Sequence, residues 1–133
     1  MTSFAEWSLP VLAMATRGEV LLLVSDLLIA ELQEAPQKVR ELIPAIPAAN
    51  QALVQVNDET DLLLQAYMKD KIVGRRYTTD AHHVAMASVY RADVLLSWNF
   101  KHIVHLDKIR KFNGVNLRLG YPIVEIRSPK EYV

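Results

Sequence analysis

The chain has 133 residues and no cysteine, and its 15 lysine and arginine residues balance 15 aspartates and glutamates. This length suits a single domain, residues 1–133, while the absence of cysteine excludes disulfides and thiolate chemistry and suits a reducing compartment. The balanced charge excludes a bulk polyanion binder, so any nucleic acid would be held by local patches of charge, and any metal by oxygen or imidazole.

Two features of the sequence bear on location. The longest apolar stretch, Val20 to Ala30, contains Ser25 and Asp26 and is too short to span a bilayer. The first ten residues, MTSFAEWSLP, lack the basic start and the long apolar core of a signal peptide. We therefore expect a cytoplasmic protein that makes no membrane contact.

The predicted elements begin with a helix and a buried strand. Residues 6–17 carry apolar side chains at helical spacing and stop before Gly18, which predicts a helix closed by glycine. The run EVLLLVS, residues 19–25, has the continuous apolar pattern of a strand buried on both faces of a parallel sheet. This run is the first strand that the sequence predicts.

Two helices follow this strand. Ser25 or Asp26 is expected to cap a helix over residues 27–33, because the side-chain oxygen of either residue accepts from the free N–H groups of a first turn. Pro36 predicts the start of a further helix, PQKVRELIPAI, which the two later prolines break into a loop.

A strand and a longer helix come next. ALVQV, residues 52–56, has the length and composition of a short strand. Asp58 or Thr60 is expected to begin a helix that runs through Val73 and stops at Gly74. Strand and helix signals therefore alternate up to the middle of the chain.

The last part of the chain repeats this alternation. Thr78 or Thr79 is expected to cap an alanine-rich helix over residues 80–91. Within it, Ala81, Ala85 and Ser88 form a stripe of small side chains that favours close packing. A buried strand, a further helix and a closing strand are then predicted at residues 94–97, 99–113 and 122–126.

This order predicts an α/β fold with a mostly parallel sheet and right-handed crossovers, in which ligands bind beyond the carboxyl ends of the strands. Glu31 follows the first strand by one or two helical turns, Asp80 starts the alanine-rich helix, and Asn99 comes just after the strand at 94–97. We expect these three residues to face one crevice. Their oxygens are ligands of the kind that Mg²⁺ or Mn²⁺ requires.

Each of these residues also has a purely structural explanation. An acid such as Asp80 stabilises the start of a helix through the helix dipole. Glu31 suits an exposed helical face, and Asn99 can cap the helix that follows it. Spacing alone does not decide between these roles and a metal site.

The histidines do not form a zinc motif. His82 and His83 are adjacent, so they lie about 100° apart on a helix and cannot share a face. His83 is one turn from Asp80 and is expected to contact that carboxylate, a substrate phosphate or local backbone. His102 and His105 are three residues apart, a spacing that can share a metal, but the sequence offers no third ligand nearby.

Basic residues concentrate in two runs, KDKIVGRRY at residues 69–77 and KHIVHLDKIRK at residues 101–111. A nuclease needs such patches to neutralise backbone phosphates, although each run also suits a solvated helix end. Trp98 and Phe100 are either core anchors or a surface on which a base stacks. The candidate substrate contacts are His83, Arg75, Arg76, Lys101 and His102.

Three stretches together resemble PIN-domain proteins, the nuclease superfamily that includes VapC-type toxins. They are VSDLLIAEL, TTDAHHVAMASVYRADVLLSWNFKHI and GYPIVEIRSP. The resemblance covers nearly the whole chain, and the middle stretch is its most specific part. It implies a three-layer fold with a mostly parallel central sheet flanked by helices, and an endoribonuclease that depends on Mg²⁺ or Mn²⁺.

The resemblance also assigns roles. Glu31 and Asp80 match acids that hold the metal in the family, and Asn99 stands where many members have another acid. An asparagine still offers a neutral carbonyl oxygen. The implied substrate is RNA, and the implied partners are an antitoxin protein and a second copy in a homodimer.

The chain departs from the family at its N-terminus. Members begin with a strand that ends in Asp-Thr or Asp-Ser, and here Met1 falls almost directly before the first helix. A central strand of the sheet and the first catalytic aspartate are therefore expected to be missing, which would leave two strand edges facing a gap. We expect rearrangement or strand exchange with a second copy to close this gap.

Two functions follow from this departure. The first is a metal-dependent endoribonuclease, for which we expect the reading frame upstream of Met1 to supply the missing strand. The second is a catalytically silent PIN-like module that binds RNA or a protein partner. Asp80→Ala and an assay of RNA cleavage separate them.

Overall fold

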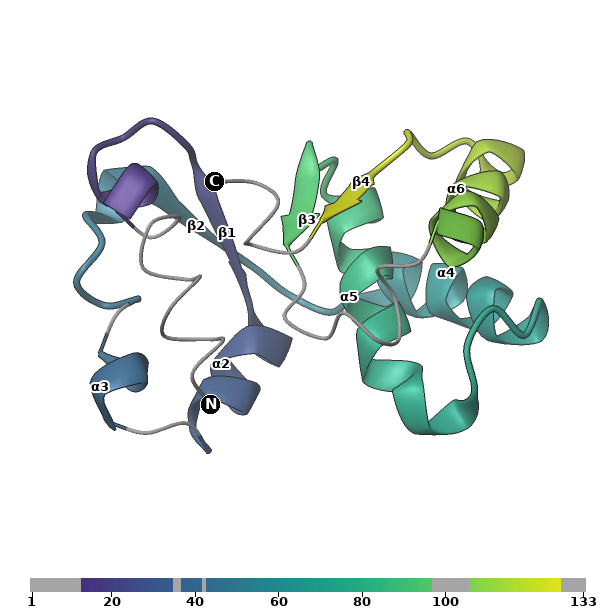
Figure 1. Cartoon of the computed structure of the whole chain (residues 1–133), viewed down its shortest axis with the longest axis horizontal. Coiled ribbons are helices and arrows are strands. Elements are labelled where there is room, and N and C mark those ends of the chain that lie inside the picture. The colour runs from purple at the N-terminus through teal and green to yellow at the C-terminus, as the bar shows by residue number, and fades with distance from the viewer. Residues whose placement is uncertain (1–12, 35–36, 42, 97–105, 128–133) are drawn as a thin grey trace. The chain divides into compact units, whose positions relative to one another are not determined.

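The computed structural model of the chain (Figure 1) describes residues 13–34, 37–41, 43–96 and 106–127. The chain divides into two compact units, a first unit of residues 1–55 with 132–133 and a second unit of residues 56–131. Each unit contains helices and a two-stranded sheet, so the structure is mixed α/β, as predicted. Among the helices in the described residues, none is long and apolar enough to cross a membrane.

The first unit begins with a helical turn at residues 13–16 that ends at a glycine, as predicted. Gly18 has a φ of +77°, and the N–H groups of Gly18 and Glu19 donate to the carbonyls of Ala15 (3.1 Å) and Met14 (2.9 Å). These two bonds close the turn in the Schellman pattern, which uses the left-handed backbone that glycine adopts without strain. The predicted start of this helix, residues 6–12, lies outside the described residues.

The sheet of the first unit joins β1, Leu22–Ser25, to β2, Gln51–Val54. The strands are parallel, with Leu22 opposite Gln51 and Ser25 opposite Val54. Val24 is buried, but Leu21 is 60% exposed and Leu53 is 73% exposed. The predicted burial of this region on both faces is therefore wrong at Leu21, because a sheet of two strands has few neighbours to cover both of its faces.

Two short helices lie between β1 and β2. α2, Asp26–Leu32, is capped by Ser25, whose Oγ accepts from the N–H of Leu28 at 3.0 Å. Ser25 is one of the two residues predicted to cap this helix. α3, Gln37–Arg40, is much shorter than the predicted helix. Turns replace the helix from residue 43, because a residue before proline avoids the helical conformation and proline itself lacks an N–H. The 3₁₀ turn η1, Ala48–Asn50, then leads into β2.

The second unit is built from three longer helices and a second parallel pair of strands. The helices are α4 (Asp58–Lys69), α5 (Thr78–Val89) and α6 (Leu106–Leu119). The strands are β3 (Val94–Leu96) and β4 (Glu125–Arg127), paired from Val94 with Glu125 to Leu96 with Arg127. The largest fully buried apolar side chains are Tyr67, Phe112, Leu63, Ile126, Val84 and Val124.

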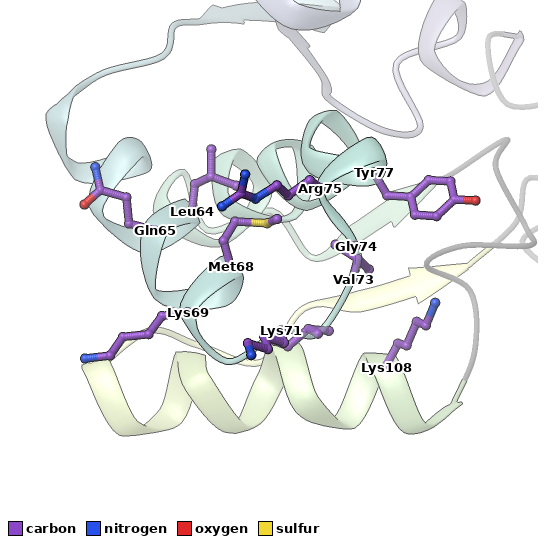
Figure 2. Close-up of a pocket in the computed structure, with 11 residues that line it drawn as sticks. Leu64, Gln65, Met68, Lys69, Lys71, Val73, Gly74, Arg75, Tyr77 and Lys108 are labelled. Atoms are coloured by element: carbon purple, nitrogen blue, oxygen red, sulfur yellow. The ribbon is translucent and has the colours of Figure 1, made fainter.

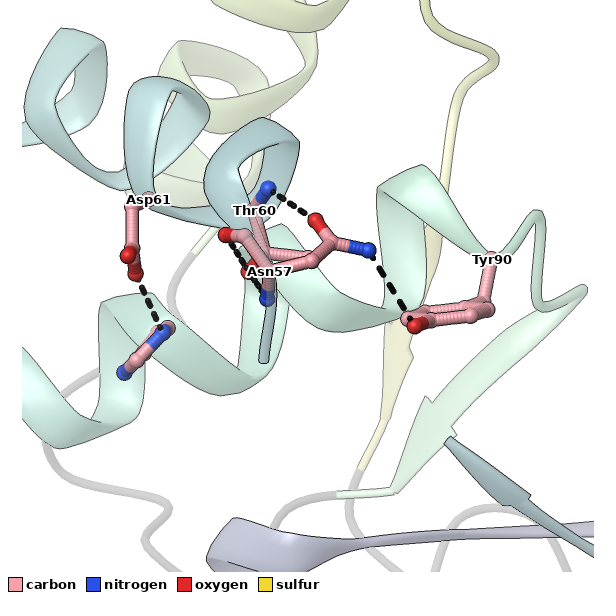
Figure 3. Close-up of polar contacts among 5 residues, drawn as sticks. Asn57, Thr60, Asp61 and Tyr90 are labelled. Atoms are coloured by element: carbon pink, nitrogen blue, oxygen red, sulfur yellow. Dashed lines mark hydrogen bonds and ion pairs between the residues drawn. The ribbon is translucent and has the colours of Figure 1, made fainter. Parts of the chain in front are cut away.

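α4 begins at Asp58, one of the two predicted starting residues. Asn57 caps it, because the Asn57 side chain accepts from the N–H of Thr60 (2.9 Å) and the Thr60 hydroxyl oxygen accepts from the N–H of Asn57 (2.9 Å) (Figure 3). Asn57 Nδ2 also donates to the hydroxyl of Tyr90 over 3.3 Å. Thr60, the other predicted starting residue, lies within the first turn and completes the cap.

α4 also ends earlier than predicted. It stops at Lys69 rather than near Gly74, because Lys71 has a φ of +56° and leaves the helical conformation. The N–H groups of Lys71 and Ile72 donate to the carbonyls of Met68 (3.1 Å) and Tyr67 (3.5 Å), the bonding of a Schellman turn. This turn directs Ile72 into the core, where it is buried.

α5 follows the 3₁₀ turn η2, Arg75–Tyr77, without a side-chain cap. The predicted threonine cap is wrong, because Thr78 already has helical backbone and its hydroxyl donates to the carbonyl of Arg75. The predicted packing role of the small stripe is confirmed, since Ala81, Ala85 and Ser88 are all fully buried. Small side chains allow a helix to approach its neighbours closely.

Three buried polar side chains join the three long helices of the second unit. The hydroxyl of Tyr67 in α4 donates to Oδ1 of Asn116 in α6. Nδ2 of Asn116 donates to Oγ of Ser88 in α5 (2.8 Å) and to the carbonyl of Pro122 (3.2 Å). Ser88 Oγ in turn donates to the carbonyl of Val84 at 2.7 Å. Each of the three side chains therefore finds hydrogen-bond partners despite its complete burial.

Candidate functional site

The predicted metal-binding residues are distributed over both units. Glu31 is in α2 of the first unit, and Asp80 is in the first turn of α5 in the second unit, where it is partly buried. Asn99 lies outside the described residues. The common crevice of these three residues therefore stays a prediction.

A metal ion needs several donors at one place. Within the described ranges, no three side chains of histidine, aspartate or glutamate lie close enough together to hold an ion. Asp80 alone supplies one carboxylate, whereas Mg²⁺ is bound in octahedral geometry by carboxylates, waters and substrate oxygens.

His82 and His83 are adjacent on α5, so their side chains point in different directions. Nε2 of His82 lies 3.5 Å from Oδ1 of Asp61 in α4 (Figure 3). This nitrogen is buried and makes no hydrogen bond of good geometry within the described part of the chain. The contact joins α4 to α5, and no zinc motif arises from His82 and His83. His102 and His105 lie outside the described residues.

A pocket of about 740 Å³ lies in the second unit, between the end of α4, the segment that follows it, and α6 (Figure 2). Its apolar wall comes chiefly from Leu64, Met68, Ile72 and Val73. The pocket is an open depression of the surface rather than an enclosed cavity. The described residues that line it are Leu64, Gln65, Met68, Lys69, Lys71, Ile72, Val73, Gly74, Arg75, Tyr77 and Lys108.

The two basic runs of the sequence meet at this pocket. Lys69, Lys71 and Arg75 come from the first run, and Lys108 comes from the second. Figure 2 shows Lys108 rising from α6 toward the segment that carries Val73. None of the described residues that line the pocket is acidic. The pocket is therefore positively charged at neutral pH.

One neighbouring acid, Asp70, offsets part of this positive charge. Asp70 lies between Lys69 and Lys71 in the sequence, but its Oδ2 is 3.5 Å from Nη1 of Arg118. This pair is exposed to solvent, so its interaction is weak and screened by salt.

Of the predicted substrate contacts that the structure describes, one, Arg75, lines the pocket. The guanidinium carbon of Arg76 lies 5.3 Å from the centre of the Tyr77 ring. His83 is partly buried on α5, and Lys101 lies outside the described residues. Sequence reasoning located both basic runs but missed Lys71 and Lys108, because the turn at Lys71 and the start of α6 decide which cations share a pocket.

Comparison of the chain with models of known protein families, with curated proteins and with solved structures finds no match.

Proposed function

We propose that the chain is a PIN-like module that cleaves RNA phosphodiester bonds in a reaction that depends on Mg²⁺ or Mn²⁺. One observation supports this proposal more than any other: the described strands pair as β1 with β2 and β3 with β4, in parallel. A mostly parallel sheet is what the resemblance to PIN-domain proteins implies. The order of strands and helices along the chain agrees with it.

The proposal assigns Glu31 and Asp80 to the metal and Asn99 to a neutral oxygen beside it, as the resemblance implies. An antitoxin protein and a second copy of the chain are the proposed partners, and the cytoplasm is the proposed location. The described residues do not assemble the donors that a metal ion needs. The assignments of Glu31 and Asp80 therefore rest on the resemblance.

A second candidate function is RNA binding without cleavage. Two observations favour it: the described residues hold no group of three metal ligands, and a positively charged pocket lies in the second unit. Lysine and arginine side chains bind phosphates by charge, which requires no metal. Both candidates act on RNA and differ in whether a bond is broken.

Cleavage of end-labelled single-stranded RNA in Mg²⁺ or Mn²⁺ tests the proposal. We expect Asp80→Asn to lower the cleavage rate by roughly 100-fold or more, because changes to partners of metal ligands alone cost about 10- to 100-fold. Asp93→Asn is the matched control, since Asp93 is exposed and precedes β3. Circular dichroism checks that both variants fold.

Three outcomes separate the candidates. Cleavage that EDTA abolishes, that Asp80→Asn loses and that Asp93→Asn keeps supports the nuclease. Binding of RNA with no cleavage in either metal contradicts the nuclease and supports the binding module. Absence of both binding and cleavage contradicts both candidates.

A further inference from the structure

We infer that the positively charged pocket of the second unit binds single-stranded RNA, with phosphates at its lysines and arginine and a base against its apolar wall. This inference deepens the proposed function, since it takes RNA as the ligand. It goes beyond that function because the residues that bind RNA here are not the proposed metal ligands.

The charges of the pocket are not all explained by helix stability. Lys69 is in the last turn of α4 and Lys71 follows it, where the negative end of the helix dipole favours cations. Lys108 lies on α6, far from the C-terminal end of that helix, so the dipole does not account for it. With no acid among the described lining residues, this gathering of cations suits a bound anion.

The apolar wall identifies the class of anion. Leu64 and Met68 are partly buried and lie among the cations, Ile72 and Val73 are buried behind them in the core, and the aromatic ring of Tyr77 stands at the edge of the group drawn in Figure 2. Each nucleotide of a single strand combines a charged phosphate with a flat base whose faces are open to stacking. A duplex hides these faces within its stack, and an acidic peptide offers charge without them. The combination of cations and apolar surface therefore favours single-stranded RNA.

Fluorescence anisotropy of a labelled RNA of about 12 nucleotides, a length within the usual range of single-strand sites, measures the binding. The full chain is used in EDTA, so that cleavage does not interfere. We expect Lys108→Glu to raise the Kd roughly tenfold and to reduce the slope of log K against log salt by ~0.7, the loss of one phosphate contact.

Arg110→Glu is the matched control, because Arg110 is exposed on the same helix, does not line the pocket and undergoes the same change of charge. We expect it to change the Kd by less than about twofold, as for a charge remote from the phosphates. Lys108→Gln provides a milder variant that removes the cation without adding an acid. Thermal melts confirm that all three variants are folded.

The competition arm uses unlabelled single strand, the matching duplex and polyglutamate. Displacement by the single strand at lower concentration than by the other two supports the inference. Equal displacement by polyglutamate would show a general anion site and overturn it, as would equal effects of Lys108→Glu and Arg110→Glu. If the chain binds RNA through the pocket residues but never cleaves it, the proposed nuclease is contradicted and this inference holds.

Discussion

The hydroxyl of Tyr67 is buried, and its pKa lies well above the ordinary value for tyrosine. Burial raises the pKa of Tyr67 from 10.0 to about 12, while hydrogen bonds to Ser88 and Asn116 oppose part of this rise. The buried site therefore favours the protonated hydroxyl, which donates to Asn116. Sequence reasoning placed Tyr67 on a helix but did not predict this network, since its members lie on three different helices.

The free energy of unfolding should fall as the pH rises through the window from 10 to 12. The folded chain keeps the Tyr67 proton that the unfolded chain loses, so stability is lost at about 1.4 kcal/mol per pH unit above pH 10. Urea unfolding at pH 9 and pH 11 measures this loss. We expect wild type to lose roughly 1 kcal/mol more than Tyr67→Phe over this interval.

Tyr121 supplies the control for this experiment. A hydrogen bond to the Glu59 carboxylate, 2.7 Å from the Tyr121 hydroxyl, raises the pKa of Tyr121, and that group is far less buried than Tyr67. Tyr121→Phe should keep most of the loss of stability seen in wild type. Equal losses in wild type and Tyr67→Phe would contradict the assignment to Tyr67.

At the scale of elements, most helices and strands could be predicted, but some of their ends could not. The apolar runs before Asp26 and after Asp93 became β1 and β3, because continuous apolar side chains favour a strand. The helix predicted from Pro36 is reduced to α3. The start of α4 at Asp58 was predicted, but its end was missed, since the turn at Lys71 depends on backbone bonds that several residues compete to make.

The cap of α4 should be measurable as stability. Asn57→Ala removes the oxygen that accepts from the N–H of Thr60, and we expect it to lower the free energy of unfolding by about 1 kcal/mol. Asn57→Asp keeps an acceptor at this position and should restore most of the loss. Urea unfolding of the three proteins provides the measurement.

A second contact of Asn57 requires its own control. Tyr90→Phe removes the hydroxyl that accepts from Asn57 Nδ2 and leaves the cap intact. If Asn57→Asp lost as much stability as Asn57→Ala, the capping explanation would be wrong and the Tyr90 contact would be the better account.

At the scale of the whole molecule, the described residues of the two units form buried clusters of different size. The buried apolar cluster of the first unit consists of Ala15 and Ile46 in the described residues, whereas that of the second unit draws on α4, α5, α6 and β4. The sequence predicted the α/β class and the parallel pairing. It did not predict the division at residue 55, because no change in composition marks it.

Hydrogen exchange should reveal this difference. Amides of buried, well-packed segments exchange only through costly openings, whereas sparsely packed segments open at little cost. We expect peptides from α4, α5 and α6 to be protected longer than peptides from β1 and β2, as measured by mass spectrometry after normalisation to the unfolded chain. Greater protection of β1 and β2 would contradict the contrast between the cores.

The candidate site, too, was only partly predictable from the sequence. The two basic runs are visible as local composition, but the set of cations that line the pocket depends on the left-handed turn at Lys71 and on the point where α6 begins. Glu31 and Asp80 were assigned to the metal from the resemblance. The sequence alone does not give the distance between them.

The network of Tyr67, Ser88 and Asn116 also bears on the uniqueness of the packing. Apolar side chains alone let neighbouring helices slide or rotate past one another at modest cost, since hydrophobic contact has no preferred direction. The amide of Asn116 forms bonds in fixed directions to α4, to α5 and to the segment before β4. A rotation of α6 about its own axis would leave buried donors and acceptors without partners, so these bonds select one orientation among many of similar apolar burial.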